Sequence, residues 1–172
     1  MWKAILGYLT LGLLSACSFT VTVPLPDQTL TLTASNTTGK ILYPKTPLGA
    51  SAPIQTARVI LTGEAELSPF TPISLDVYAR TSAPSPSSGC VDLSPYVDAY
   101  ACDVTQADAI VGRIDFKAAQ TTSFTLGQTG GEILAQGINQ GQLWLGVKVA
   151  GTGSVNATLH LKNMKATVTA QL

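Results

Sequence analysis

The chain has 172 residues, with 10 Lys and Arg, 10 Asp and Glu, and a single His. This balance excludes the strongly basic surface by which a protein binds nucleic acid, so no nucleic-acid partner is expected. Only 12% of the residues are charged, and the exposed faces are therefore expected to be neutral and polar.

The chain opens with a short leader of the secretory type. Lys3 supplies a positive start, and residues 4–14 form an apolar run that is well short of the roughly 20 residues of a membrane-spanning helix. The run ends in Leu14-Ser15-Ala16-Cys17, which resembles the lipobox of bacterial lipoproteins. This resemblance implies that residues 1–16 are a cleaved signal peptide and that the Cys17 thiol carries a diacylglyceryl lipid.

The same resemblance implies a location in the cell envelope. A mature chain of residues 17–172 would be anchored by its lipid, with the membrane and other envelope proteins as its partners. Ser18, directly after the cysteine, is compatible with sorting to the outer membrane or cell surface, because the inner-membrane retention signal of the family resembles Asp at that position. No cofactor is expected besides the covalent lipid on Cys17.

Alternating apolar and polar residues dominate the first half of the mature chain, as is typical of half-buried strands. The alternation predicts strands over residues 19–25, 29–34, 58–67 and 73–80. Pro24 and Pro26 suit the first of these strands to a sheet edge. The intervening residues 36–53 are rich in Gly, Pro and Ser, so they are predicted to be a loop.

Residues 81–106 form the one long irregular stretch, and they contain two of the three cysteines. Once Cys17 is assigned to the lipid, Cys90 and Cys102 remain as an even pair in an oxidising compartment, which predicts a disulfide. A loop of this size would stabilise the fold by about 3 kcal/mol in the chain-entropy model. Two free thiols are the alternative interpretation.

Strands resume after this stretch. They are predicted over residues 110–117, with Ile110, Ile114 and Phe116 inward, and over residues 123–126. Apolar residues at helical spacing between glycines predict one short helix over residues 130–141. Three further strands are expected to form a final meander over residues 142–172, with turns at 151–153 and 162–163.

The total of eight or nine strands with one short helix predicts an all-β fold. Their spacing favours a single antiparallel β-sandwich over residues 17–172, of immunoglobulin-like or jelly-roll type. A small closed barrel is the second choice.

Aromatic residues are the candidate contact residues. Tyr96 and Tyr100 lie between the two cysteines, where an exposed pair would anchor a partner or stack on a sugar. Trp144 lies on the strand face opposite Leu143 and Leu145. It either packs under the predicted helix, which is the favoured interpretation, or is an exposed binding residue.

The long loop also contains carboxylates. Asp92, Asp98 and Asp103 are weak candidates for a calcium site, since calcium prefers oxygen ligands. Their spacing matches no known calcium loop, and a solvated acidic loop is the favoured interpretation. No metal site is therefore predicted.

No catalytic residue is predicted. His160 is expected on the polar face of its strand, and the chain has no Gly-x-Ser-x-Gly motif. The inferred sandwich with its disulfide-pinned loop resembles the architecture of secreted copper-only superoxide dismutases. Such a copper site needs several imidazoles, and one histidine cannot build it within this chain.

These observations predict a non-catalytic lipoprotein that serves as a structural, accessory or binding subunit of an envelope complex. The alternatives are a metal-binding or enzyme-like envelope sandwich and a carbohydrate-binding module. The low aromatic content, 6% of residues, weakens the carbohydrate-binding alternative.

Overall fold

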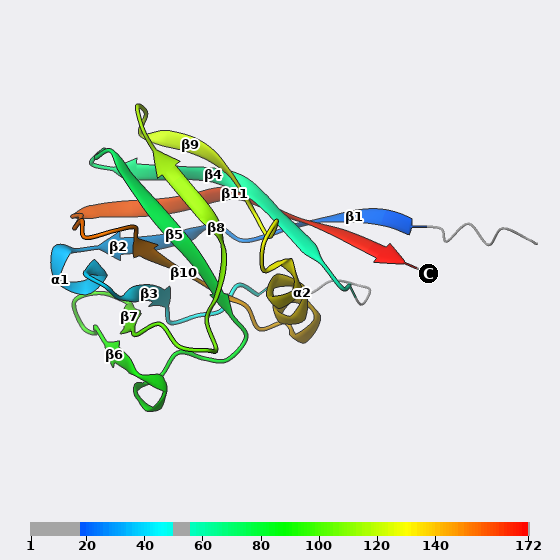
Figure 1. Cartoon of the computed structure of the whole chain (residues 1–172), viewed down its shortest axis with the longest axis horizontal. Helices are drawn as coiled ribbons and strands as arrows, with labels where there is room; N and C mark the ends of the chain where they lie inside the picture. The colour runs from blue at the N-terminus through cyan, green and yellow to red at the C-terminus, as the bar shows by residue number, and fades with distance from the viewer. Residues whose placement is uncertain (1–17, 50–55, 172) are drawn as a thin grey trace, which may run out of the picture.

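A computed structural model describes residues 18–49 and 56–171 of the chain. In these residues eleven strands form two antiparallel sheets that pack face to face (Figure 1). This confirms the predicted all-β sandwich, with eleven strands in place of eight or nine, and the sheets are separate rather than joined in a closed barrel. The predicted signal peptide and lipobox, including Cys17, lie outside the described residues.

The first sheet has the order β1-β11-β4-β9, and β2 pairs with the other half of β11. Its strands are β1 (Ser18–Pro24), β2 (Gln28–Leu32), β4 (Val59–Ser68), β9 (Thr121–Leu126) and β11 (Ala157–Gln171). The second sheet has the order β6-β7-β3-β10-β5-β8. Its strands are β3 (Ile41–Pro44), β5 (Ile73–Arg80), β6 (Cys90–Asp92), β7 (Ala99–Cys102), β8 (Ala109–Phe116) and β10 (Trp144–Val149).

The helix α2 (Gly131–Gln140) confirms the predicted short helix. Gly130 and Gly141 flank it, and both have left-handed backbone angles that a side chain would disfavour, so the two glycines define its ends. Leu134 and Ile138 are fully buried and dock the helix onto the sandwich. Two single turns complete the described structure, α1 (Ala34–Thr37) and the 3₁₀ turn η1 (Pro86–Ser88).

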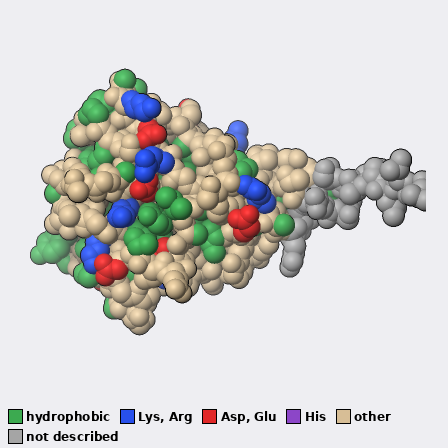
Figure 2. Space-filling model, in the orientation of Figure 1, with side chains coloured by type: hydrophobic (Ala, Val, Ile, Leu, Met, Phe, Trp, Pro, Cys, Tyr) green, Lys and Arg blue, Asp and Glu red, His purple; other side chains and the backbone are tan. Residues whose placement is uncertain are grey.

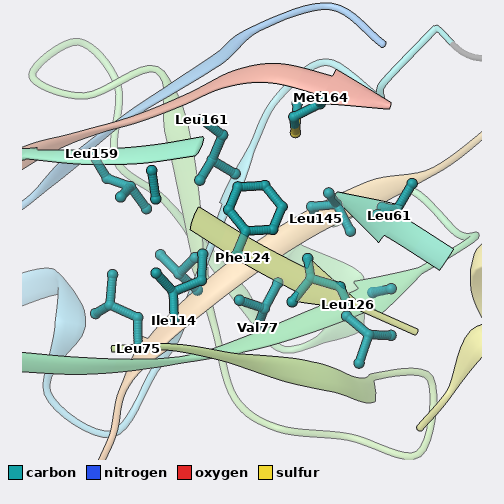
Figure 3. Packing of buried hydrophobic residues seen from close by; sticks show 14 of the residues in the cluster. Leu61, Leu75, Val77, Ile114, Phe124, Leu126, Leu145, Leu159, Leu161 and Met164 are labelled. Atoms are coloured by element: carbon teal, nitrogen blue, oxygen red, sulfur yellow. The ribbon is translucent and has the colours of Figure 1, made fainter. Parts of the chain in front are cut away.

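The main core fills the space between the two sheets (Figure 3). The Phe124 ring lies at its centre, between Leu161 of the first sheet and Val77 of the second. These positions alternate with polar ones along their strands, because successive side chains of a strand point to opposite faces. Alternation in the sequence therefore identified much of this core.

The predicted final meander is wrong. β10 belongs to the second sheet and β11 to the first, so the chain crosses the sandwich between them. The predicted turn at residues 162–163 is also wrong, because β11 runs through it as one strand of 15 residues. The register with β4 shifts at a bulge around Asn163, which has a positive φ of 52°. Asn is common in turns, which is why a turn was predicted here.

Three short strands were missed. β3 lies inside the predicted loop 36–53, and all four of its residues are buried, so no alternation marks it. β6 and β7 lie inside the stretch predicted to be irregular, where they pair with each other and extend the second sheet. A strand of three or four residues is too short to show a period in the sequence.

The inward face of β8 differs from the prediction at one end. A register irregularity opposite Val77 and Tyr78 turns Val111 into the core and leaves Ile110 45% exposed. The bulge adds one residue to the strand, and the side chains before it change faces. Ile114 and Phe116 lie beyond the bulge and are buried as predicted.

Gly146 of β10 allows the close approach of β3. A methyl group added there would lie 2.5 Å from Cε1 of Tyr43 and 2.6 Å from Cγ2 of Ile41. We therefore expect Gly146→Ala to lower the free energy of unfolding by about 1–3 kcal/mol, the usual effect of overpacking. Urea denaturation measures the change. Gly153→Ala is the matched control, since its methyl group would meet only Val149 at 3.4 Å, and equal effects of the two changes would contradict the packing argument.

Candidate functional site

The segment of residues 81–108, here called the disulfide segment, contributes the end strands β6 and β7 to the second sheet, and its Asp108 contacts Arg80 and Tyr43 on the outer face of that sheet. Cys90 and Cys102 are directly paired residues of β6 and β7, and their sulfur atoms are bonded, which confirms the predicted disulfide. The disulfide packs with Ile41, Tyr43 and Trp144 in a second, smaller core. The second sheet is thus buried on both faces here, which explains why β3 and most of β10 show no exposed side.

Trp144 is only 5% exposed and lies in this second core, beneath the disulfide segment. Both sequence interpretations of it are therefore wrong, since it neither packs under α2 nor offers an exposed binding surface. Its position opposite Leu145 on the strand was correct. The sequence did not reveal that residues of the disulfide segment, distant along the chain, help to bury this face of β10.

A buried charge network joins the second core to the disulfide segment. Arg80 ends β5 with a side chain that is 2% exposed, and its Nη1 lies 3.6 Å from Oδ1 of the fully buried Asp108 carboxylate. The Tyr43 hydroxyl donates to the same oxygen at 2.8 Å. The backbone N–H and the hydroxyl of Thr105 each donate to Oδ2 at 2.8 Å. Asp108 therefore has partners on both oxygens.

The guanidinium of Arg80 has further neighbours. Its carbon lies 5.6 Å from the centre of the Tyr43 ring, and Nη2 donates to the hydroxyl of Ser82 at 3.1 Å. Nε has no hydrogen-bond partner among the described residues. Burial raises the pKa of Tyr43 far above its ordinary value, and the negative charge of Asp108 raises it further. The Tyr43 hydroxyl thus stays protonated and remains a donor to Asp108.

Two surface ion pairs attach the disulfide segment to the β3 region. Lys45 lies 2.8 Å from Asp92, and Lys40 lies 2.5 Å from Asp103. The hydrogen bond with Asp92 raises the pKa of Lys45, and the same bond lowers the pKa of Asp92. Lysines thus pair with two of the three carboxylates considered for calcium, and Asp98 is exposed. The described part of the chain holds no group of three residues able to bind a metal ion.

Tyr96 is the most exposed large apolar side chain among the described residues, at 92%. It lies on the turn between β6 and β7, where its backbone N–H and that of Val97 both donate to the carbonyl of Leu93. The turn is therefore ordered although its tip is exposed. Beside it lies a shallow hollow of about 250 Å³ between this turn and the α1 region, lined by Thr33, Ser35, Leu93, Tyr96 and Val97.

The structure separates the two tyrosines that the sequence grouped. Tyr100 is half-buried on β7, where it packs against the second core and its ring centre lies 5.4 Å from the Lys45 ammonium. It helps to hold the disulfide segment in place. Only Tyr96 of the pair is freely exposed, and it is the residue that a partner could reach.

His160 lies on the outer face of β11, as the alternation predicted. Its Nδ1 is 3.1 Å from the Thr29 hydroxyl on β2, and Glu66 is its cross-strand neighbour on β4. Glu66 itself pairs with Lys162, and this contact lowers its pKa. The histidine therefore takes part in cross-strand contacts on the first sheet, away from the disulfide segment.

Sequence reasoning missed Arg80, Asp108 and Tyr43 as a group. Alternation placed Arg80 on the polar face of β5, but nothing local indicates that this face is covered. Asp108 lies 28 positions after Arg80 and 65 positions after Tyr43 along the chain, so only the fold brings them together. Their contacts tie the end of the disulfide segment to β3 and β5.

A scan of protein-family models finds none that matches this chain, and a search of curated protein sequences finds no significant match. None of the helices in the described residues is long and apolar enough to cross a membrane. Function therefore has to be argued from the surface itself. Its distinguishing feature is the 92% exposed ring of Tyr96, on a turn that lies between the two disulfide-bonded strands.

Proposed function

We propose that this protein is a non-catalytic lipoprotein of the cell envelope, anchored through lipid on Cys17, that binds a partner protein through the turn carrying Tyr96. The lipobox-like ending Leu14-Ser15-Ala16-Cys17 supports the anchor and the envelope location. Ser18 in the following position supports sorting to the outer membrane.

The observation that carries the binding role is the exposure of Tyr96 on an ordered turn. Tyrosine offers a large contact area with only two side-chain torsions to restrict, and it is enriched among residues that dominate binding energy. A turn that is already held in place loses little conformational entropy when a partner binds. The apolar hollow lined by Leu93 and Val97 adds contact area next to the ring.

The position of this turn fits an anchored protein. Figure 1 places α1, which borders the same hollow, at the end of the sandwich opposite the start of β1 and the end of β11. A lipid on Cys17 would thus leave the Tyr96 turn at the end away from the anchor. That end is the one open to other envelope proteins.

We expect Tyr96→Ala to abolish recovery of the partner when the acylated protein is purified from native membranes. Removing a central tyrosine from an interface costs about 2 kcal/mol or more, which is a loss of affinity of roughly 30-fold. The measurement is quantitative mass spectrometry of co-purified envelope proteins, with the acyl group on Cys17 verified in the same samples.

Ile110→Ala is the matched control, because Ile110 is also exposed and apolar but lies next to Gly130 at the α2 end. It should recover the same partner as the unmodified protein. If Tyr96→Ala recovered the same partners as the unmodified protein, this would contradict the proposed binding turn. An unmodified Cys17 thiol would contradict the proposed anchor, and binding to a glycan array that depends on Tyr96 would favour the carbohydrate-binding alternative.

A further inference from the structure

The end of the sandwich formed by β1 and the last residues of β11 lies directly next to the proposed anchor in the chain. β1 begins at Ser18, the residue directly after Cys17, and it is paired from its first residue. Its register with β11 runs without a break from Ser18 opposite Gln171 to Pro24 opposite Lys165. No unpaired residue therefore separates the sandwich from the position proposed to carry lipid.

We propose that this strand end rests in the headgroup layer of a phospholipid bilayer, so that the sandwich stands on the membrane in a fixed orientation. The proposal depends on the acylation of Cys17 proposed above. One strand residue spans about 3.3 Å, and the headgroup layer on each side of a bilayer is roughly 6 Å thick. A lipid attached at Cys17 therefore brings Ser18 and its partner Gln171 to the bilayer surface.

The residues at this end suit such a place. Residues 18–26 of the chain and residues 166–171 of β11 contain no charged side chain. Phe19, the second residue of β1, is 38% exposed, and Phe is among the apolar side chains that interfacial segments bury at the boundary between headgroups and hydrocarbon. Thr20, Thr22 and Thr169 are exposed and supply hydroxyls that can meet headgroups and water.

The broad faces of the sandwich are different. Figure 2 shows acidic and basic side chains on the face that carries β5 and β8. Asp76 of β5 and Arg113 of β8 form an ion pair at 2.7 Å. Charged groups favour water over the bilayer interface. The uncharged ends of β1 and β11 thus suit the membrane better than this charged face, which is expected to stay in solution.

An upright orientation gives the Tyr96 turn a defined height. β11 spans the long axis of the sandwich in Figure 1, and its 15 residues measure about 50 Å at 3.3 Å per residue. The α1 end and the adjoining Tyr96 hollow would then be held on the order of 50 Å above the bilayer. The protein would act as a spacer of fixed length that presents its binding turn to a partner.

Tryptophan fluorescence with nitroxide-headgroup lipids tests the orientation. The acylated protein is reconstituted in phosphatidylethanolamine and phosphatidylglycerol vesicles, and quenching is compared among the unmodified protein, Phe19→Trp and Tyr96→Trp. The buried Trp144 supplies the common background, because it is the only tryptophan of the mature chain. We expect the added fluorescence of Phe19→Trp to be quenched several-fold more than that of Tyr96→Trp.

A second variant tests whether the direct connection between Cys17 and β1 holds the strand end at the membrane. A flexible Gly and Ser linker inserted between Cys17 and Ser18 keeps the anchor but frees the sandwich, and it should reduce the quenching of Phe19→Trp several-fold. Equal quenching of the two tryptophan variants, or no effect of the linker, would overturn the docking while leaving the anchor intact. Vesicle flotation and the acyl mass report the anchor separately, and their absence would remove both proposals.

Discussion

Asp108→Ala is expected to destabilise the protein by about 3–5 kcal/mol, the effect of removing one partner of a buried ion pair. The change would leave the buried guanidinium of Arg80 without its carboxylate and the Tyr43 hydroxyl without its acceptor. It would also free both donors of Thr105, which hold the end of the disulfide segment. The midpoint of urea unfolding, with its slope unchanged, measures the loss.

Asp98→Ala is the control, because Asp98 is an exposed aspartate of the same segment. Surface substitutions of this kind usually change stability by no more than about 0.5 kcal/mol. Arg80→Met in the Asp108→Ala background should recover part of the loss, since it removes the unpaired charge. A small effect of Asp108→Ala, or no recovery with Arg80→Met, would show that the network does not stabilise the fold as argued.

The double change Cys90→Ala and Cys102→Ala is expected to lower the free energy of unfolding by about 3 kcal/mol, from the loop that the bond closes. The sulfurs also pack against Trp144 and Tyr43 in the second core, so part of the loss is lost packing. Hydrogen exchange should rise in residues 81–108 and remain slow in β4 and β11, because those strands belong to the opposite sheet.

Reduction of the unmodified protein under mild denaturant provides the matched comparison, since it breaks the bond and keeps both sulfurs. The exchange pattern of the reduced protein should match that of the double variant. Uniform loss of protection across both sheets would contradict the view that the disulfide segment is a local cover. If the double variant were as stable as the unmodified protein, this would contradict the argument that the disulfide stabilises the fold by confining the unfolded chain.

Sequence alternation was sufficient for the strands that expose one face. β5 was predicted with the bounds that it has, and β1, β4 and β9 were predicted within one or two residues of theirs. β4, β5 and β9 each bury one face and leave the other at least partly in contact with water, and in β1 the half-buried Val21 and Val23 alternate with exposed residues. The period of two in the sequence is a direct record of that contrast.

The same reasoning failed where both faces are buried. β3 reads as a short apolar run without alternation, and it was assigned to a loop because Gly, Pro and Ser surround it. In the structure it lies in the middle of the second sheet, with Leu42 in the main core and Tyr43 in the second core. The outer face of β3 is buried by contacts with the disulfide segment, which comes much later in the chain.

In the candidate site too, some residues were predicted from the sequence and others were not. Tyr96 was identified from its place inside the disulfide loop, and its exposure agrees with the proposed role. Trp144 was misassigned because its burial depends on the disulfide segment. Arg80 was placed on the correct face of β5 but could not be recognised as buried, since its partner Asp108 comes from a different part of the chain.

The sequence by itself determined the all-β class, the short helix between its glycines and the disulfide, and its lipobox-like motif predicts an anchor that stays a prediction. Each of these rests on local chemistry, which is the period of a strand, the freedom of glycine, the parity of cysteines or a short motif. Only the tertiary structure decided which sheet takes each strand, which polar face becomes a second core, and which aromatic ring stays exposed. Those outcomes depend on contacts between distant residues, because burial is a property of what covers a side chain and not of the side chain itself.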